Sequence, residues 1–377
     1  SSDRVSEDRA GTAVAVSGDF MVVGIPGTAA DFGAAKVYAR AVPGNASSSW
    51  TLHATLNGTH AGLWSGDTFG AVVDIDGDAV VVGDPTNGQA YVFERQSNTD
   101  EWAPNGIFTV QTITRLDYPQ GGVGMSVAIG GDILVVGASY TPGGASLMCG
   151  AAHVYARDAT AWTSVQVVRP DDFGGYTLQS AVFFGVSVAT RDGIVVIGRS
   201  SYSEKNAVVL FCNSNRCDLD AILSGFDDGW NEFGVQVAVD ADANGVVVVI
   251  GGANGGANGY AASFSRDAKI GSNFSDPEFI FPEKPETHPE FGSSGIAVSG
   301  DVIVVGSHTE ESSGVAFVYR RYTPRSGAPY AWVLSAKLFP EQDQHGYPVV
   351  GDEFGTAVAV DGDSVFVGAP GDNLGRA

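Results

Sequence analysis

One short stretch of the chain carries oxygen-bearing side chains at a spacing that suits a hard metal ion. Asp240, Asp242 and Asn244 alternate with alanine, and Gly245 follows them. Alternating oxygen ligands with a glycine for the sharp turn suit a hard cation. The alternative is an ordinary turn, because Asp, Asn and Gly are common turn formers. A second, weaker candidate set contains Asp74, Asp76 and Asp78. Calcium is the one cofactor that the sequence suggests.

The three cysteines divide into a pair and a single residue. Cys212 and Cys217 flank Asn-Ser-Asn-Arg between two strand-like runs. A hairpin would hold them opposite one another at a separation that a disulfide can bridge. We predict this disulfide, with two reduced thiols as the alternative, and the pair is too small for a structural zinc site. Cys149 is expected to be a small buried residue or a free thiol.

Motifs of the common catalytic and nucleotide sites are absent from the sequence. There is no nucleophile elbow, HExxH, Walker loop or dinucleotide fingerprint, and the glycine-rich segment 251–259 lacks the required spacing. His60, His288 and His345 lie between repeats, where they form either a shared site or separate exposed side chains. The prediction is a chain without catalytic residues, and the alternative is a catalytic site built from several repeats.

A hairpin-like segment recurs seven times along the chain. It is AGTAVAVSGDFMVVGIP at 10–26 and EFGTAVAVDGDSVFVGAP at 353–370. The glycines that mark the copies are Gly11, Gly70, Gly124, Gly185, Gly234, Gly292 and Gly355, spaced 49 to 63 residues apart. Such a period is typical of a repeat architecture in which neighbouring units bury one another.

Each repeat predicts four short antiparallel strands. In the second copy these are 71–76, 79–83, 89–95 and 108–116, separated by Gly, Asp and Asn turns. The first two are apolar on both faces and should be buried, whereas the outer two alternate. This gradient is typical of a propeller blade. The Gly-Asp pairs between the first two strands fit hairpin turns.

The predicted fold class is therefore all-β: a seven-bladed β-propeller of four-stranded antiparallel blades. The seventh blade has only its inner two strands. The whole chain, 1–377, forms one propeller, with blades at about 10–68, 69–122, 123–183, 184–232, 233–290, 291–353 and 354–377.

Two groups of side chains are candidates for an interaction surface. Glu232, Glu290 and Glu353 each precede a Phe-Gly pair, so a closed ring would bring them to one side of the channel mouth. They form either an acidic arc that attracts a cation or a basic partner, or separate hydrogen bonds to their own turns. Aromatic residues lie among carboxylates in the long loops. They form either a binding surface or contacts that hold those loops against the propeller. These are Trp64, Tyr118, Tyr176, Trp230 and Tyr347.

The composition limits the partners. The net charge of −23 repels phosphate backbones, which argues against nucleic acid. No apolar run approaches the roughly 20 residues that span a bilayer. Sequons begin at Asn45, Asn57 and Asn273, all expected in loops between strands, and together with the predicted disulfide they favour an extracellular or cell-surface protein.

The Phe-Gly and Gly-Ala-Pro residues around each hairpin resemble the FG-GAP repeat, found in the head of integrin α subunits. The fit is cleanest in FGTAVAVDGDSVFVGAP, while Ala10 and Val123 replace the Phe in two copies. The resemblance implies a seven-bladed extracellular propeller used in adhesion or assembly. It also implies calcium in the longer loop of the fifth repeat, although Val248 stands where the family places an Asp.

The function predicted from the sequence is a non-enzymatic structural or adhesive module in a larger cell-surface or matrix assembly. Its partners would be other proteins of that assembly, with glycans as further candidates. The alternatives are a carbohydrate-binding lectin that uses the aromatic loop face, or an enzyme with a site built from several blades.

Overall fold

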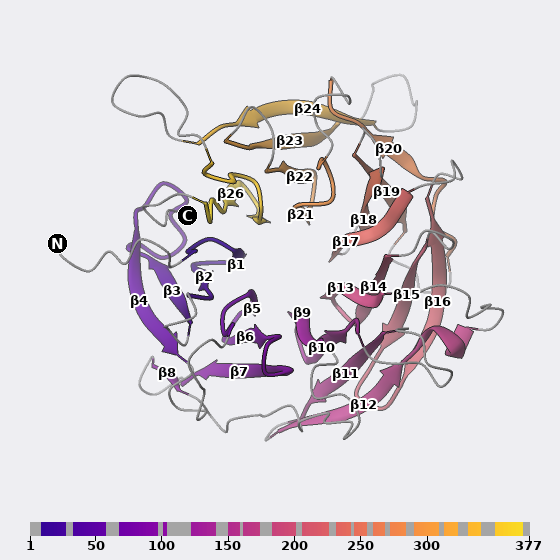
Figure 1. Cartoon of the computed structure of the whole chain (residues 1–377), viewed down its shortest axis with the longest axis horizontal. Helices are drawn as coiled ribbons and strands as arrows, with labels where there is room; N and C mark the ends of the chain where they lie inside the picture. Colours follow the sequence, from indigo (N-terminus) through magenta and orange to yellow (C-terminus); the bar gives the residue numbers. More distant parts are fainter. Residues whose placement is uncertain are drawn as a thin grey trace.

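The computed structural model of the chain is a ring of antiparallel sheets around a central axis (Figure 1). It describes residues 9–27, 33–57, 68–96, 101–103, 122–140, 150–158, 161–173, 183–200, 206–225, 231–242, 245–254, 259–267, 272–283, 290–308, 313–322, 331–340 and 351–371. Six sheets have four strands and one has two. The described ranges contain no helix with the length and apolar character needed to cross a membrane.

The first three sheets, called blades 1 to 3, follow one another along the chain. Their strands are β1 (Ala13–Ser17), β2 (Phe20–Ile25), β3 (Ala34–Arg40), β4 (Trp50–Asn57); β5 (Val72–Asp76), β6 (Ala79–Asp84), β7 (Gln89–Arg95), β8 (Trp102–Ala103); β9 (Val123–Gly130), β10 (Ile133–Ala138), β11 (Ala151–Arg157) and β12 (Trp162–Val168). A short 3-10 helix, η2 (Pro170–Phe173), follows blade 3.

Blades 4 to 6 have the same order, and the two-stranded sheet comes last. Their strands are β13 (Phe183–Arg191), β14 (Ile194–Ser200), β15 (Asn206–Cys212), β16 (Cys217–Ser224); β17 (Asn231–Asp242), β18 (Gly245–Asn254), β19 (Tyr260–Arg266), β20 (Glu278–Ile280); β21 (Ile296–Ser299), β22 (Val302–Ser307), β23 (Val315–Tyr322) and β24 (Ala331–Leu338). The last sheet pairs β25 (Val358–Asp361) with β26 (Ser364–Val367).

The predicted burial gradient is confirmed. All six residues of β6 are buried, whereas β4 mixes exposed and half-buried positions. In blade 2 the fourth strand is Trp102–Ala103, ahead of the predicted segment 108–116, which lies outside the described residues. The apolar core is divided among the junctions between blades. Phe69, for example, is fully buried against Tyr91 and Phe93 at the junction of blades 1 and 2.

The two repeated glycines meet across every junction of the ring. At the end of each second strand stands a glycine whose missing Cβ would overlap the backbone carbonyl of the marker glycine in the next blade. The pairs are Gly24–Gly70, Gly83–Gly124, Gly137–Gly185, Gly198–Gly234, Gly251–Gly292, Gly306–Gly355 and Gly368–Gly11. All seven marker glycines have positive φ, between 79° and 95°, where a side chain is strained. The repeated motif is thus the condition for blades to pack this closely.

The last pair closes the ring between the two-stranded sheet and blade 1. Around it, Trp50 packs edge-on against Phe366 with ring centroids 5.2 Å apart. The Arg40 guanidinium donates a hydrogen bond of 2.6 Å to the hydroxyl of Ser364. The two-stranded sheet therefore occupies a place in the ring like that of the four-stranded ones.

The outer hairpins repeat a second pairing. The last residue of the third strand is an arginine opposite a tryptophan in Arg40–Trp50, Arg95–Trp102 and Arg157–Trp162, and Arg321 faces Trp332 in blade 6. In blade 4 the same place holds Cys212 opposite Cys217, and the predicted disulfide joins them. In blade 4 a covalent bond thus takes the place of a cation–π contact. In blade 1 that contact puts Cζ of Arg40 4.4 Å from the ring centroid of Trp50.

The glycine junction predicts a specific steric cost. Gly137→Ala should lower the free energy of unfolding by about 3 kcal/mol or more, because its Cβ would meet the carbonyl of Gly185, which is backbone and cannot turn away. Gly44→Ala is the control. It has positive φ but an open neighbourhood, so it should cost only about 1 kcal/mol. Chemical denaturation measures both, and equal losses would contradict the role given to the junction.

Candidate functional site

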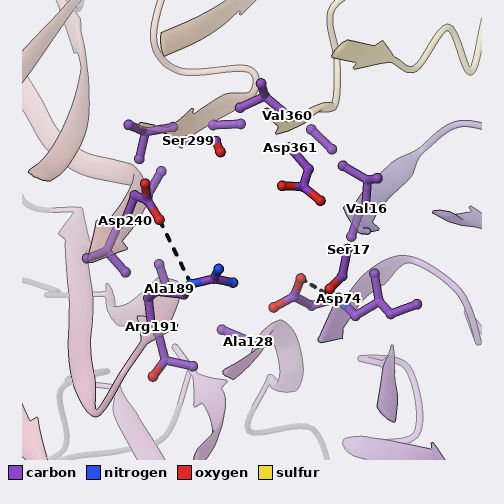
Figure 2. Close-up of a pocket in the computed structure, with 18 of the residues that line it drawn as sticks. Val16, Ser17, Asp74, Ala128, Ala189, Arg191, Asp240, Ser299, Val360 and Asp361 are labelled. Atoms are coloured by element: carbon purple, nitrogen blue, oxygen red, sulfur yellow. Dashed lines mark hydrogen bonds and ion pairs between the residues drawn. The ribbon is translucent and has the colours of Figure 1, made fainter. Parts of the chain in front are cut away.

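An axial cavity of about 260 Å³ lies where the inner strands of the seven sheets meet. Each inner strand contributes a run of three or four residues to its wall. Aliphatic residues make up most of the wall, and polar groups gather at the end where the inner strands turn back (Figure 2). The fold thus places side chains from different blades around one small lumen.

One layer of this wall breaks the repeat. The five other blades and the two-stranded sheet place an alanine there, and blade 2 places Asp74. The six alanines are Ala15, Ala128, Ala189, Ala238, Ala297 and Ala359. Since alanine suffices for the fold in six of the seven sheets, the structure does not require a carboxylate in blade 2.

The carboxylate of the half-buried Asp74 is held by backbone groups in the wall of the lumen. Its Oδ1 accepts the N–H of Ile75 at 2.9 Å, and its Oδ2 accepts the N–H of Ile129 in blade 3 at 2.8 Å. Burial raises the pKa of Asp74 from 3.8 to about 7, since desolvation disfavours the charged form more than the two hydrogen bonds favour it. Asp76 adds to the rise and Arg191 opposes it. The group therefore exchanges its proton near neutral pH.

Hydrogen bonds from blade to blade surround the mouth of the lumen. A side chain at or near the end of an inner strand accepts the N–H of the turn glycine in the next sheet. The pairs are Gly18–Asp361 (2.6 Å), Gly77–Ser17 (3.1 Å), Gly131–Asp76 (2.7 Å), Gly300–Asp240 (2.6 Å) and Gly362–Ser299 (3.2 Å). The Gly18–Asp361 bond joins the last sheet to the first. These turns are the predicted Gly-Asp hairpin turns. The residue before each turn glycine determines which polar group faces the mouth of the lumen.

Blades 3 and 4 interrupt this series and introduce a cation. Gly130 has no side chain to offer, and blade 4 ends its inner strand with Arg191. Arg191 lies 3.5 Å from Asp76 and 3.9 Å from Asp240, and in Figure 2 its guanidinium extends into the lumen. About half of its side chain is exposed, at 47%. The mouth thus combines an exposed cation with the carboxylate of Asp74 deeper in the wall.

The predicted calcium residues are already engaged. Asp240 accepts the N–H of Gly300 and lies beside Arg191, and Asp242 accepts the N–H of Gly245 at 3.1 Å. Asn244 lies outside the described residues. Within the described ranges, no three His, Cys, Asp or Glu side chains cluster closely enough to hold a metal ion. Calcium at this loop stays a prediction.

The predicted acidic arc is only partly visible. The carboxylate of Glu290 accepts the hydroxyl of Ser293 in its own turn at 2.7 Å, as the alternative interpretation expects. Glu353 is exposed, and its backbone carbonyl accepts a hydrogen bond from the hydroxyl of Thr356 at 2.7 Å. Glu232 lies in β17, and its side chain is outside the described part. Nothing brings the three carboxylates together among the contacts of the described residues.

Many remaining predictions fall on segments that the structure does not describe. The aromatic residues Trp64, Tyr118, Tyr176, Trp230 and Tyr347 lie there, as do Cys149, His60, His288 and His345. Of the sequon asparagines, Asn45 and Asn273 are exposed in loops, whereas Asn57 is the half-buried last residue of β4 and so lies in a strand. The aromatic surface and the glycosylation sites stay predictions.

Sequence reasoning missed the axial wall, although the signal was present. Asp74 lies four residues after its marker glycine, the offset at which Ala15, Ala128, Ala189, Ala238 and Ala359 follow theirs. Placing the seven copies in register would have shown one acid among alanines. Asp74 had been considered only as part of a calcium loop.

Comparison with known proteins supports the repeat and the fold. The FG-GAP repeat family matches residues 332–377. No curated protein matches the chain. A proposed 6-phosphogluconolactonase from Bacteroides uniformis is 10% identical, with a TM-score of 0.52 over 85% of this chain and 83% of that one. The periplasmic gluconolactonase of Pseudomonas aeruginosa is 14% identical, with a TM-score of 0.50 over 85% and 81%. At these identities the likeness shows the fold alone.

These likenesses correct one prediction. The sequence reasoning concluded that the chain is not an enzyme and serves as a non-enzymatic adhesive module, and that conclusion is wrong as drawn. Structures that share the fold include proteins named as gluconolactonases, so the propeller fold does not argue against catalysis. The physical reason is that the repeat specifies the packing between blades, whereas chemistry depends on the few side chains that face the lumen.

The repeated glycine hairpin, the family match at residues 332–377 and the ring of antiparallel sheets lead to one conclusion. The chain is a β-propeller that contains an FG-GAP repeat.

Proposed function

We propose that the chain is a hydrolase that opens a small sugar-derived lactone at the mouth of the axial cavity. The observation that carries the proposal is Asp74, a carboxylate with a pKa of about 7 in a wall position that the six other sheets fill with alanine. A general base is most effective when its pKa lies near the working pH. A strongly shifted carboxyl group in a cavity, beside a specific cation, is a sound candidate for a catalytic group.

The lumen suits a small substrate. A cavity of about 260 Å³ lies just below the usual range for ligand pockets, so it favours a single sugar-sized ring over a polymer. The hydroxyls of Ser17 and Ser299 and the carboxylate of Asp361 at the mouth supply partners for substrate hydroxyls. Lactone opening is also the activity in the names of fold relatives, which supports the choice of reaction class.

The residues divide the reaction between a base and a cation. Asp74 removes a proton from a water molecule as the water oxygen attacks the carbonyl carbon of the lactone. Arg191 faces the oxyanion that forms, and its charge stabilises it. When the bond between the carbonyl carbon and the ring oxygen breaks, the proton passes from Asp74 to the departing oxygen. The product is the open-chain hydroxy acid, and Asp74 is again a carboxylate.

The same proposal includes a finer description of the ring. The two-stranded sheet is the inner half of a seventh blade, supported by its glycine junctions to blade 6 through Gly306 and to blade 1 through Gly368. The disulfide and the exposed sequon residues Asn45 and Asn273 support an extracellular setting for the enzyme.

Activity is predicted to depend on Asp74. Hydrolysis of glucono-δ-lactone, followed by pH-stat titration above the spontaneous rate, should fall about 10²–10⁴-fold in Asp74→Ala and Asp74→Asn. Arg191→Gln should lower kcat by about 10–10³-fold. Asp132→Asn is the control, because that side chain is 73% exposed in a surface ion pair and should leave activity unchanged. A wild-type rate no faster than the spontaneous one, or full activity in Asp74→Ala, would rule the proposal out.

The pH profile has a defined direction. Because the base must be ionised to accept a proton, kcat/KM should rise with pH and reach half its plateau near pH 7. The kinetic measurement is a series of initial rates from pH 5 to 8. A profile that is already flat at pH 5 would mean that the base ionises with an ordinary carboxyl pKa.

The contribution of Asp74 to the free energy of unfolding should decrease as pH rises, whereas a carboxylate in an ordinary ion pair contributes more at higher pH. The folded-state pKa of Asp74 lies above its ordinary value of 3.8, so between about pH 4 and 7 the folded chain keeps a proton that the unfolded chain has released. The contribution of Asp74 to stability is therefore lost as pH rises through this window. Asp74→Ala should be more stable than wild type by about 1–3 kcal/mol at pH 8, with a smaller difference at pH 4. Urea titration at both pH values measures it, and a difference that shrinks toward pH 8 would contradict the shift.

A further inference from the structure

A second cavity, of about 450 Å³, lies between blades 5 and 6 on the side of the inner turns. We call it the blade 5–6 cavity. It is lined by residues of β17, β18 and the end of β19, by the segment before β20, and by Gly300, Asp301 and Arg321 of blade 6. The axial site does not account for it.

Beside this cavity, blade 5 lacks an ion pair that blade 6 and two other blades have. In blades 1, 3 and 6 an arginine at or next to the end of the third strand pairs with the aspartate of its own inner turn. The pairs are Arg40–Asp19 at 3.4 Å, Arg157–Asp132 at 3.3 Å and Arg321–Asp301 at 3.5 Å. Blade 5 has the arginine, Arg266, but its turn ends in Gly245 where the others have Gly-Asp.

Arg266 is instead directed away from the turn. It forms a 2.6 Å ion pair with Asp220 of blade 4, and the two side chains are only 2% and 7% exposed. Its guanidinium lies 4.5 Å from the ring centroid of Phe274. The space that an arginine and an aspartate fill in three other blades is therefore left open next to blade 6.

The lining of this cavity contains both hydrogen-bond acceptors and hydrogen-bond donors. Asp242 and Asp267 are exposed carboxylates on its rim, and Asp301 with Arg321 forms the opposite wall. Ser272, Asn273 and Ser275 lie along the third side. The described residues contain no cluster that could hold a metal ion. Mixed acceptors and donors of this kind match the vicinal hydroxyls of a pyranose, each of which both donates and accepts.

A sequon lies on the rim of the same cavity. Asn273 is exposed and lines the cavity, and Asn273-Phe274-Ser275 satisfies the N-glycosylation pattern. A sugar joined to Asn273 would therefore begin at the opening of a sugar-sized polar space. The other exposed sequon residue, Asn45, does not line this cavity.

From the cavity, its lining and the position of Asn273, we infer that the blade 5–6 cavity binds one pyranose unit. That unit is supplied either by the first sugar of a glycan on Asn273 or by a free saccharide. Asp240 lines both cavities, but the reaction proposed for the axial lumen is assigned to Asp74 and Arg191, and neither of these lines the blade 5–6 cavity.

The attached source is tested on full-length chain secreted from a glycosylating host. Glycopeptide mass spectrometry establishes whether Asn273 carries a glycan. If it does, enzymatic removal of the glycan should lower Tm measurably, and Asp267→Ala should abolish that difference. Asn45→Gln is the matched control and should leave the difference intact. A glycan on Asn273 whose removal shifts Tm equally in wild type and Asp267→Ala would overturn the attached source.

The free source is tested on unglycosylated full-length chain. Calorimetric titration with methyl glucoside and with N-acetylglucosamine should show saturable binding. Asp242→Ala and Asp267→Ala should each weaken it about tenfold, with unchanged Tm as the check on folding. Saturable binding that these variants do not affect would place the sugar elsewhere and overturn the assignment. Failure of both sources, with no glycan-dependent protection and no saturable binding, would overturn the inference as a whole.

Discussion

The close contact between glycines of neighbouring blades is the constraint on which the rest of the structure depends. At each of the seven junctions a glycine at the end of a second strand lies against the carbonyl of the next marker glycine, and a methyl group would not fit. This contact sets how near adjacent sheets come, and hence how their apolar faces interlock. It also explains the two fixed glycines of the repeated motif. Since each blade buries its faces only against its neighbours, the same contact at Gly368 and Gly11 closes the ring.

Closure creates the setting for chemistry. Seven inner strands around one axis leave a narrow lumen whose wall is mostly aliphatic, so a charged group placed there loses much of its hydration. Asp74 is such a group, held by N–H groups from its own blade and from blade 3. Its high pKa is thus a consequence of the packing between blades. The same distance between blades fixes how close the turns at the mouth lie to one another. There Arg191 forms ion pairs with both Asp76 and Asp240, and Gly130 between them has no side chain.

Much of the fold follows from the sequence, because local signals and the repeat agree. The third strand of the second repeat, 89–95, has the bounds predicted from its turns, and the pairing of Cys212 with Cys217 follows from the hairpin between them. The site does not follow in the same way. The depth of Asp74 in the wall, the turning of Arg266 toward Asp220 and the cavity beside it depend on distances between blades. A single repeat does not contain that information, and only an alignment of all seven copies isolates Asp74.

The central claim is that ring closure places a carboxylate where it ionises near neutral pH. The most direct measurement is the ¹³C NMR titration of the Asp74 carboxyl carbon in selectively labelled protein, with Asp74→Ala used to assign the signal. The account predicts a midpoint near pH 7. A midpoint near pH 4, the ordinary value for an aspartate in water, would contradict it and would remove the basis for assigning a base to the axial lumen.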